Sequence, residues 1–215
     1  MKIFAVVLAG CGVSDGAEIH EATLTMLAIV KNGASYQLFA PDIEQHHVIN
    51  HLTGKEMPEK RNVLVESARI ARGQIKPLSS FDAASADALI FPGGFGVAKN
   101  LCTYAFKSAD CEVNPEVAAA IRAMDQLKKP IGALCISPVI LAKILGEVEI
   151  TIGDDPGTAA AVEKMGARHR NTTHGEVVID EKRNVLTTPC YMIDASILDI
   201  AHGTENIVKA MLAKM

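Results

Sequence analysis

The chain has 215 residues, of which 49% are hydrophobic and 21% are charged, with a net charge of −4 and an isoelectric point near 6.0. This length allows one domain, residues 1–215, with a full hydrophobic core. The sequence has no basic stripe, so nucleic acid is not an expected partner. The apolar run at residues 3–9 is too short to span a membrane and leads directly into a glycine-rich turn, so we interpret it as a first strand rather than a membrane or secretion signal.

The five cysteines are an odd number and contain no Cys-x-x-Cys spacing. Neither a disulfide framework nor a zinc site fits this pattern, and the histidines also match no metal-ligand spacing. We therefore predict no metal and a reducing, cytoplasmic location.

Strand and helix signals alternate along the first half of the chain. Residues 2–8 form a continuous apolar strand, as expected when both faces of a sheet are covered. Asp15, with Glu18 three residues later, is expected to cap a helix that ends at Gly33. Further segments are predicted as a strand at 36–40, a loop or short hairpin at 46–57, a helix at 62–72, a strand at 88–91 and a helix at 113–127.

The second half continues the alternation. We predict strands at 131–134, 149–152, 176–179 and 184–187, a helix that begins near Ser137, and a closing amphipathic helix at 195–212. Alternating strands and helices indicate an α/β fold with a doubly wound, mostly parallel sheet and helices on both faces.

Cys135 is the first candidate for chemistry. It lies between a short apolar strand and a helix start, which places a thiol on a tight turn, as in the nucleophile elbow of α/β-hydrolases. The free amides at a helix start favour thiolate, so this position suits a nucleophile. The alternative is a small cysteine that only fills the core.

In a doubly wound sheet, ligands bind beyond the carboxyl ends of the strands. Gly93 and Gly94 follow one such strand, and the amides of Gly94 and Ile136 are candidates for an oxyanion hole beside Cys135. Cys11 ends the first strand and is expected to line the same pocket. The alternative for the glycines is a tight turn that requires positive φ.

Glu21 lies on the apolar stripe of the first helix, one turn after Glu18. Burial and the neighbouring acid would raise its pKa, so that it can donate a proton to a nearby thiolate, with His20 as a possible helper. The alternative is a solvated surface acid. His174 and Glu176 are a second acid–base candidate. His174 lies only 39 residues after Cys135, which is a short sequence separation for a catalytic triad.

Three motifs carry a resemblance to a known family. They are residues 10–22 (GCGVSDGAEIHEA), residues 92–101 (PGGFGVAKNL) and residues 135–138 (CISP), with further similarity at residues 48–54 and 187–192. The chain resembles the PfpI-like branch of the class I glutamine amidotransferase-like superfamily, and within it the ElbB-like glyoxalases, essentially from end to end.

The resemblance implies a flavodoxin-like fold and cofactor-free conversion of glyoxal and other small α-oxoaldehydes into hydroxy acids, with a homodimer as the assembly. Cys135 matches the nucleophile, Glu21 the acid, and Gly94 and Ile136 the amide donors. Many members carry a histidine after the nucleophile's helix, whereas residues 151–155 contain none. A full triad is therefore not implied, and the activity is expected to be low.

Two alternatives remain at this point. The first is a glutamine-hydrolysing subunit that uses Cys135, His174 and Glu176 and works with a synthase partner. The second is a redox-sensing or holdase protein without enzymatic activity, in which Cys135 is oxidised rather than turned over.

Overall fold

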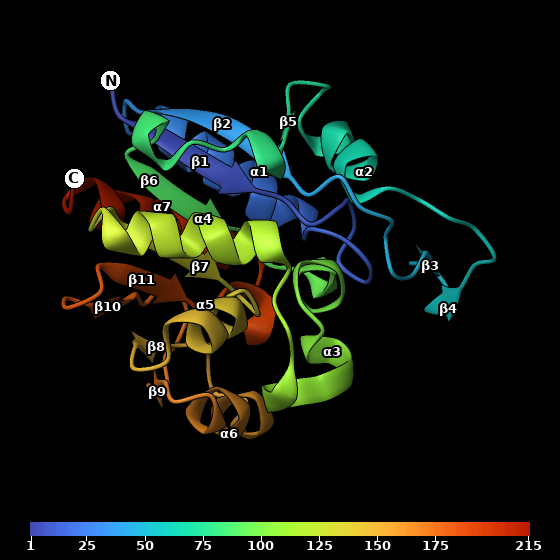
Figure 1. Cartoon of the computed structure of the whole chain (residues 1–215). Helices are drawn as coiled ribbons and strands as arrows, with labels where there is room; N and C mark the ends of the chain where they lie inside the picture. The colour runs from blue at the N-terminus through green and yellow to red at the C-terminus, as the bar shows by residue number, and fades with distance from the viewer.

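A seven-stranded sheet forms the centre of the molecule, and the structure, a computed structural model, describes residues 1–215 (Figure 1). Its strands are β1 (Ile3–Val7), β2 (Ser35–Ala40), β5 (Lys76–Pro77), β6 (Ala88–Phe91), β7 (Ile131–Leu134), β10 (Val178–Asp180) and β11 (Val185–Thr188). They lie in the order β10–β11–β7–β6–β1–β2–β5, and every neighbouring pair is parallel except β10–β11. The predicted doubly wound, mostly parallel sheet is confirmed, and the order β2–β1–β6–β7–β11 is flavodoxin-like.

Helices cover both faces of the sheet. Helices α1 (Ile19–Lys31) and α7 (Ile197–Leu212) pack against each other on one face, and α4 (Pro115–Gln126) and α5 (Pro138–Leu145) pack on the other (Figure 1). The central strands are therefore apolar on both sides, and each fully buried aliphatic side chain contributes about 1.5–3 kcal/mol to folding. At Gly132 in β7 the helix α7 approaches so closely that a Cβ would lie 2.5 Å from the Met211 sulfur.

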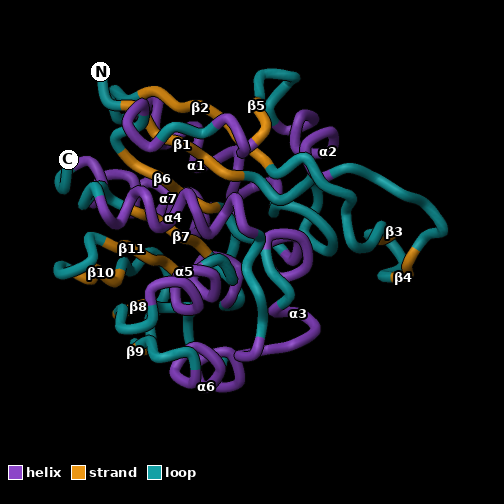
Figure 2. Tube along the Cα trace, in the orientation of Figure 1, coloured by secondary structure: helices purple, strands orange, loops and turns teal.

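A short hairpin projects from this layered body, as Figure 2 shows. It consists of β3 (Ile49–Asn50) and β4 (Lys55–Glu56), and it confirms the loop or short hairpin predicted there. The following helix α2 (Val63–Ile70) confirms the helix predicted at 62–72. It begins at Asn62, whose side-chain oxygen accepts a hydrogen bond from the Val65 amide at 3.0 Å.

The first helix begins later than predicted. Its N-cap is Glu18, whose Oε2 accepts a hydrogen bond from the Glu21 amide at 2.7 Å, so the expected cap at Asp15 is wrong. Asp15 instead accepts a hydrogen bond from the Ile49 amide at 2.6 Å. The acid therefore holds the β3–β4 hairpin against the loop that follows β1.

The strand predicted at 149–152 is shorter and lies outside the central sheet. Only β8 (Glu149–Ile150) is a strand, and it pairs with β9 (Arg168–His169). The next amide, that of Thr151, donates to the Thr187 hydroxyl at 2.9 Å instead of to a neighbouring strand. This side-chain bond ends the strand.

The helical segments that were not predicted include α3 (Tyr104–Lys107), a π-helical turn at Val97–Leu101, and α6 (Pro156–Lys164). The first two are too short to show a hydrophobic period, and α6 is rich in alanine with only a weak apolar stripe. No helix combines the length and the apolar character that crossing a membrane requires.

Candidate functional site

Cys135 occupies the sharp turn between β7 and α5, as the sequence predicted. Its φ of 58° lies in the left-handed region, a conformation that costs a non-glycine residue about 1–3 kcal/mol. The surrounding structure holds this turn in place. The Cys135 amide donates to the Thr188 carbonyl of β11 at 3.0 Å, and the Ser137 hydroxyl donates to the Pro92 carbonyl at 2.8 Å.

The side chain of Glu21, on α1, extends to the turn that holds Cys135. The Glu21 side chain is fully buried, which confirms the inward-facing position predicted from the apolar stripe. Its Oε2 accepts a hydrogen bond from the Gly93 amide at 2.8 Å, and its Oε1 accepts one from the Tyr191 amide at 3.3 Å. The carboxyl group also lies beside the Cys135 thiol, because a Cβ on Gly93 would be 2.6 Å from the Glu21 Oε2 and 2.9 Å from the Cys135 sulfur. Elements that are distant in the sequence thus bring the predicted acid and the predicted thiol together.

The predicted pair of amides also lies at the thiol. The amides of Gly94 and Ile136 lie close enough to the Cys135 sulfur to favour its ionised form. Gly94 has a φ of 103°, and a Cβ there would lie 2.4 Å from the Gly16 carbonyl oxygen, so only glycine fits. Two amides beside one sulfur can stabilise a negative charge on a substrate oxygen bound next to it.

Burial controls the protonation of the pair. Burial and the charge of Glu18 raise the pKa of Glu21 to about 7, against hydrogen bonds from Gly93, Tyr191 and Cys135 that lower it. Burial and the Glu21 charge raise the pKa of Cys135 well above its ordinary value, although the two amides act in the opposite direction.

The expectation that the helix start makes Cys135 a thiolate is therefore wrong. The helix start is present, but desolvation and a neighbouring carboxylate outweigh its effect on the thiol. Near neutral pH the sulfur keeps its proton, whereas Glu21 is divided between its acid and base forms. Glu21 can consequently take a proton from the thiol and return it to another atom.

His20 lies at the edge of this arrangement. Its Nδ1 is 2.8 Å from the Tyr191 hydroxyl, and the imidazole is exposed. Tyr191 in turn donates its amide to Glu21, so His20 is connected to the acid only through this residue. Cys190, which precedes Tyr191, is buried near both Glu21 and Cys135, and the charges of these groups contribute to its raised pKa.

Cys11 does not line the cavity at Cys135, so that expectation is wrong. The turn after β1 leads toward α2, where the Gly10 amide donates to the Ser67 hydroxyl at 2.9 Å. The charges that act on Cys11 are accordingly those of Glu66, Arg69, Asp15 and Arg61.

The second acid–base candidate is not assembled. The Glu176 carboxylate accepts hydrogen bonds from the amide and the hydroxyl of Thr173, at 2.6 and 3.0 Å, and none from the exposed His174. No group of three or more His, Cys, Asp or Glu side chains is arranged to hold a metal ion.

A mostly apolar cavity of about 230 Å³ opens at Cys135. It has several times the volume of a water molecule and fits a small organic molecule. Its lining comes from the turn after β1, the Gly-rich turn after β6 with the π-helical turn that follows it, α3, the elbow, α6 and the segment after β11. The lining residues are Val13, Gly94, Phe95, Ala98, Tyr104, Ala105, Cys135, Ile136, Thr158, Tyr191 and Met192.

A flavodoxin-like sheet with a cysteine at the elbow after β7 and a buried acid from the first helix is the arrangement of class I glutamine amidotransferase-like proteins. Comparison with known proteins agrees with this class. The human glutamine amidotransferase-like class 1 domain-containing protein 3, mitochondrial, is 46% identical over 218 residues, which cover 97% of this chain and 81% of that protein. The zebrafish (Danio rerio) ES1 protein, mitochondrial, is 38% identical over 97% of this chain and 84% of its own length.

The chain therefore belongs to the glutamine amidotransferase-like class 1 family that includes these two proteins. Among solved structures, an isoprenoid biosynthesis protein with amidotransferase-like domain from Ehrlichia chaffeensis is 35% identical, with a TM-score of 0.94 over 100% of this chain and 99% of that one. Drosophila melanogaster DJ-1beta, at 15% identity and a TM-score of 0.57, shares the fold alone. No family model matches the chain.

Proposed function

We propose that this protein is a cofactor-independent glyoxalase that converts glyoxal into glycolate and other small α-oxoaldehydes into the corresponding hydroxy acids. One observation carries the proposal. Cys135, Gly94 and Ile136 line one small cavity, and the carboxyl group of Glu21, with a pKa of about 7, is buried directly beside the Cys135 thiol.

The first step is addition of the thiol to an aldehyde carbon. Glu21 in its ionised form takes the thiol proton while sulfur bonds to carbon, and the carbonyl oxygen develops negative charge toward the two amides. Glu21 then returns the proton to this oxygen. The product is a hemithioacetal, and no oxidant or reductant is consumed.

In the second step, the Glu21 carboxylate removes the hydrogen from the carbon bonded to sulfur as a proton, and water donates a proton to the neighbouring carbonyl oxygen, which gives an enediol. Glu21 then donates its proton to the second carbon while the hydroxyl group on the sulfur-bearing carbon returns a proton to the hydroxide, which gives a thioester of glycolate with Cys135. Water cleaves this thioester, releases glycolate and restores the thiol. A carboxyl group with a pKa of about 7 suits this series of proton transfers because it can both donate and accept a proton near neutral pH.

The proposal includes a homodimer, as the resemblance implies, and a small aldehyde rather than a nucleic acid or a membrane as the partner. A reducing compartment suits the five free cysteines, and we place the protein in the cytoplasm on this ground. The human and zebrafish relatives are named as mitochondrial proteins.

Glycolate formed from ¹³C-labelled glyoxal, followed by NMR, tests the proposal. We expect product with the wild type, none with Cys135→Ala, and a rate lower by about 10²–10⁴-fold with Glu21→Gln. Cys11→Ala is the matched control, because this thiol lies outside the cavity. Full turnover by Cys135→Ala would refute the mechanism. Ammonia release from glutamine without glycolate formation would favour the amidotransferase alternative.

A further inference from the structure

A second cavity, of about 570 Å³, opens beside the first one. It lies between the β3–β4 hairpin, which contributes Ile49 and Gly54, and the segment that contains α3. Phe95, Tyr104 and Ala105 line both cavities, so the two spaces are neighbours across these side chains. A substrate longer than glyoxal can therefore place its reactive end at Cys135 and extend into the second cavity.

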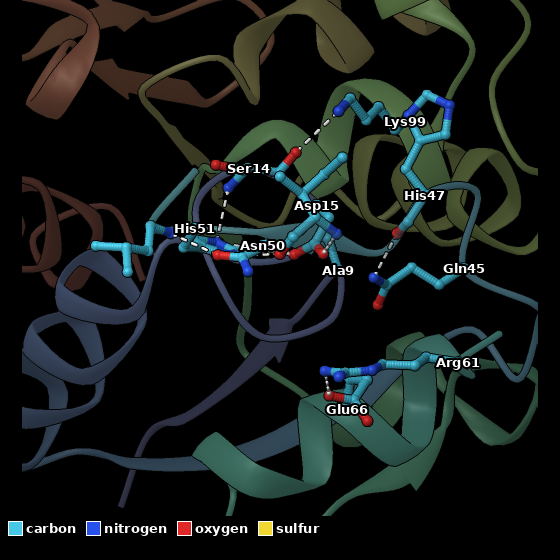
Figure 3. A network of polar contacts seen from close by, with 12 residues as sticks. Ala9, Ser14, Asp15, Gln45, His47, Asn50, His51, Arg61, Glu66 and Lys99 are labelled. Carbon is cyan, nitrogen blue, oxygen red and sulfur yellow. Dashed lines mark hydrogen bonds and ion pairs between the residues drawn. The ribbon is translucent and has the colours of Figure 1, made fainter. Parts of the chain in front are cut away.

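Lys99 is the only charged side chain among the residues that line the two cavities. It lies on the π-helical turn just after the Gly-rich loop, and its Nζ donates to the Ser14 carbonyl at 2.9 Å (Figure 3). The same Nζ lies 5.7 Å from the centre of the Phe95 ring. An ammonium group has three N–H donors, so donors remain for a ligand.

No carboxylate of the protein pairs with Lys99. Asp15, which follows the Lys99 partner Ser14, is buried, and its Oδ2 accepts a hydrogen bond from the Ile49 amide. The aromatic rings beside the cavity add no negative charge. His46 stacks on Phe106 at a centroid distance of 4.2 Å and lies 4.5 Å from the ring of His47.

His46 lies close enough to Lys99 for the ammonium charge to act on its imidazole. Burial lowers the pKa of His46 most, the charges of His47 and Lys99 lower it further, and the charge of Glu56 raises it. Lys99 supplies one fixed positive charge, which matches one carboxylate.

We propose, on the basis of the glyoxalase function above, that the preferred substrate is an α-oxoaldehyde with a carboxylate on the far end of its chain. The aldehyde carbon bonds to Cys135, the chain crosses Phe95, and the carboxylate binds Lys99. Lys99 then determines specificity, whereas Cys135 and Glu21 perform the same chemistry as on glyoxal.

The test compares 4,5-dioxopentanoate with its methyl ester, which differs in the terminal charge. We expect wild-type kcat/KM to be about tenfold or more higher for the acid, because a hydrogen bond to a charged group is lost in the ester. Lys99→Met should remove this preference mainly through KM, and Lys99→Arg should restore it in part. Lys76→Met, a change of the same charge on the exposed edge strand β5, should leave the preference unchanged. Equal kcat/KM for acid and ester, or a preference that survives in Lys99→Met, would overturn the inference.

Calorimetric titration with glutarate separates this inference from the proposed function, since it requires no turnover. Glutarate should bind the wild type and Lys76→Met, and binding should be lost in Lys99→Met and weaken as salt is raised. Lys99-dependent glutarate binding without conversion of any oxoaldehyde would refute the glyoxalase while supporting the carboxylate site. Tighter binding of inorganic phosphate than of glutarate would contradict the choice of a carboxylate.

Discussion

Cys135 and Glu21 meet over the backbone of Gly93. A Cβ on Gly93 would lie 2.4 Å from the Cys135 Cβ, 2.9 Å from its sulfur and 2.6 Å from the Glu21 Oε2. The φ of Gly93 lies outside the left-handed region, so its backbone would accept another residue. Glycine is therefore required at this position for steric reasons. The thiol and the carboxyl group can lie close together because residue 93 has no side chain between them.

Gly93→Ala should accordingly separate the pair. The added methyl group must displace Cys135 or Glu21, at a cost of about 1–3 kcal/mol in the free energy of unfolding and with loss of glycolate formation. Urea unfolding and product NMR measure the two effects. Gly157→Ala in α6 is the matched control, because its added Cβ meets only an Asp155 oxygen at 3.6 Å. It should stabilise the protein by about 0.4–1 kcal/mol. An active, fully stable Gly93→Ala protein would contradict the packing described above.

Glu21 should make stability fall as pH rises. Its pKa increases from 4.5 in the unfolded chain to about 7 in the fold, so the folded state holds the proton more tightly. This contribution is complete below pH 4.5 and is lost as pH rises through about 7, which amounts to about 3 kcal/mol. Unfolding by urea between pH 4.5 and 8.5 tests this. Glu21→Gln should remove that part of the slope, and an unchanged slope would contradict the raised pKa.

A third prediction concerns the source of the hydrogen in the new C–H bond of glycolate. Since Glu21 carries the proton between the carbons and can exchange it with water, turnover in D₂O should place deuterium on the CH₂ group of glycolate. Mass spectrometry of the product measures this. Glycolate without deuterium would show that the hydrogen passes between the carbons without exchange, which would contradict a Glu21 proton that exchanges with water. Glycolate incubated with the enzyme in D₂O is the control for later exchange.

Ser137 should help to hold both the elbow at Cys135 and the loop of Gly93 and Gly94 in position. Its buried hydroxyl donates to the Pro92 carbonyl at 2.8 Å, and so connects the elbow to the loop of Gly93 and Gly94. Ser137→Ala leaves a buried carbonyl without this partner, and we expect a loss of about 1–3 kcal/mol in stability together with a lower kcat. Ser137→Cys, which retains a weak donor, should lie between the two. A wild-type kcat in Ser137→Ala would show that the two loops hold their positions independently.

Local sequence was sufficient for the two strands that precede the Gly-rich loop and the elbow, and for the elbow itself. The strands at 88–91 and 131–134 have the predicted bounds, and the turn at Cys135 is specified by a short apolar run followed by the start of a helix. The burial of Glu21 also followed from the helical period. Each of these features depends on neighbouring residues, which a single sequence displays directly.

Several features that depend on distant contacts were not predicted correctly. The protonation of Cys135 depends on its burial and on Glu21, from another element. The turn that contains Cys11 is held near α2 by the hydrogen bond from the Gly10 amide to Ser67. The position of Asp15 depends on its hydrogen bond from the Ile49 amide in the hairpin. The second cavity was missed because the four-residue α3 and the π-helical turn that form much of its wall show no period in the sequence.

The placement of the β3–β4 hairpin and α3 has an evolutionary consequence. Both lie outside the central sheet, whereas Cys135, Glu21 and Gly93 lie on elements that the sheet and its packed helices hold in place. Insertions or substitutions in the hairpin and α3 can therefore alter the length and charge of the second cavity, while Cys135, Glu21 and Gly93 keep their positions. Two descendants of one ancestor can keep the same cysteine and acid and still act on different molecules.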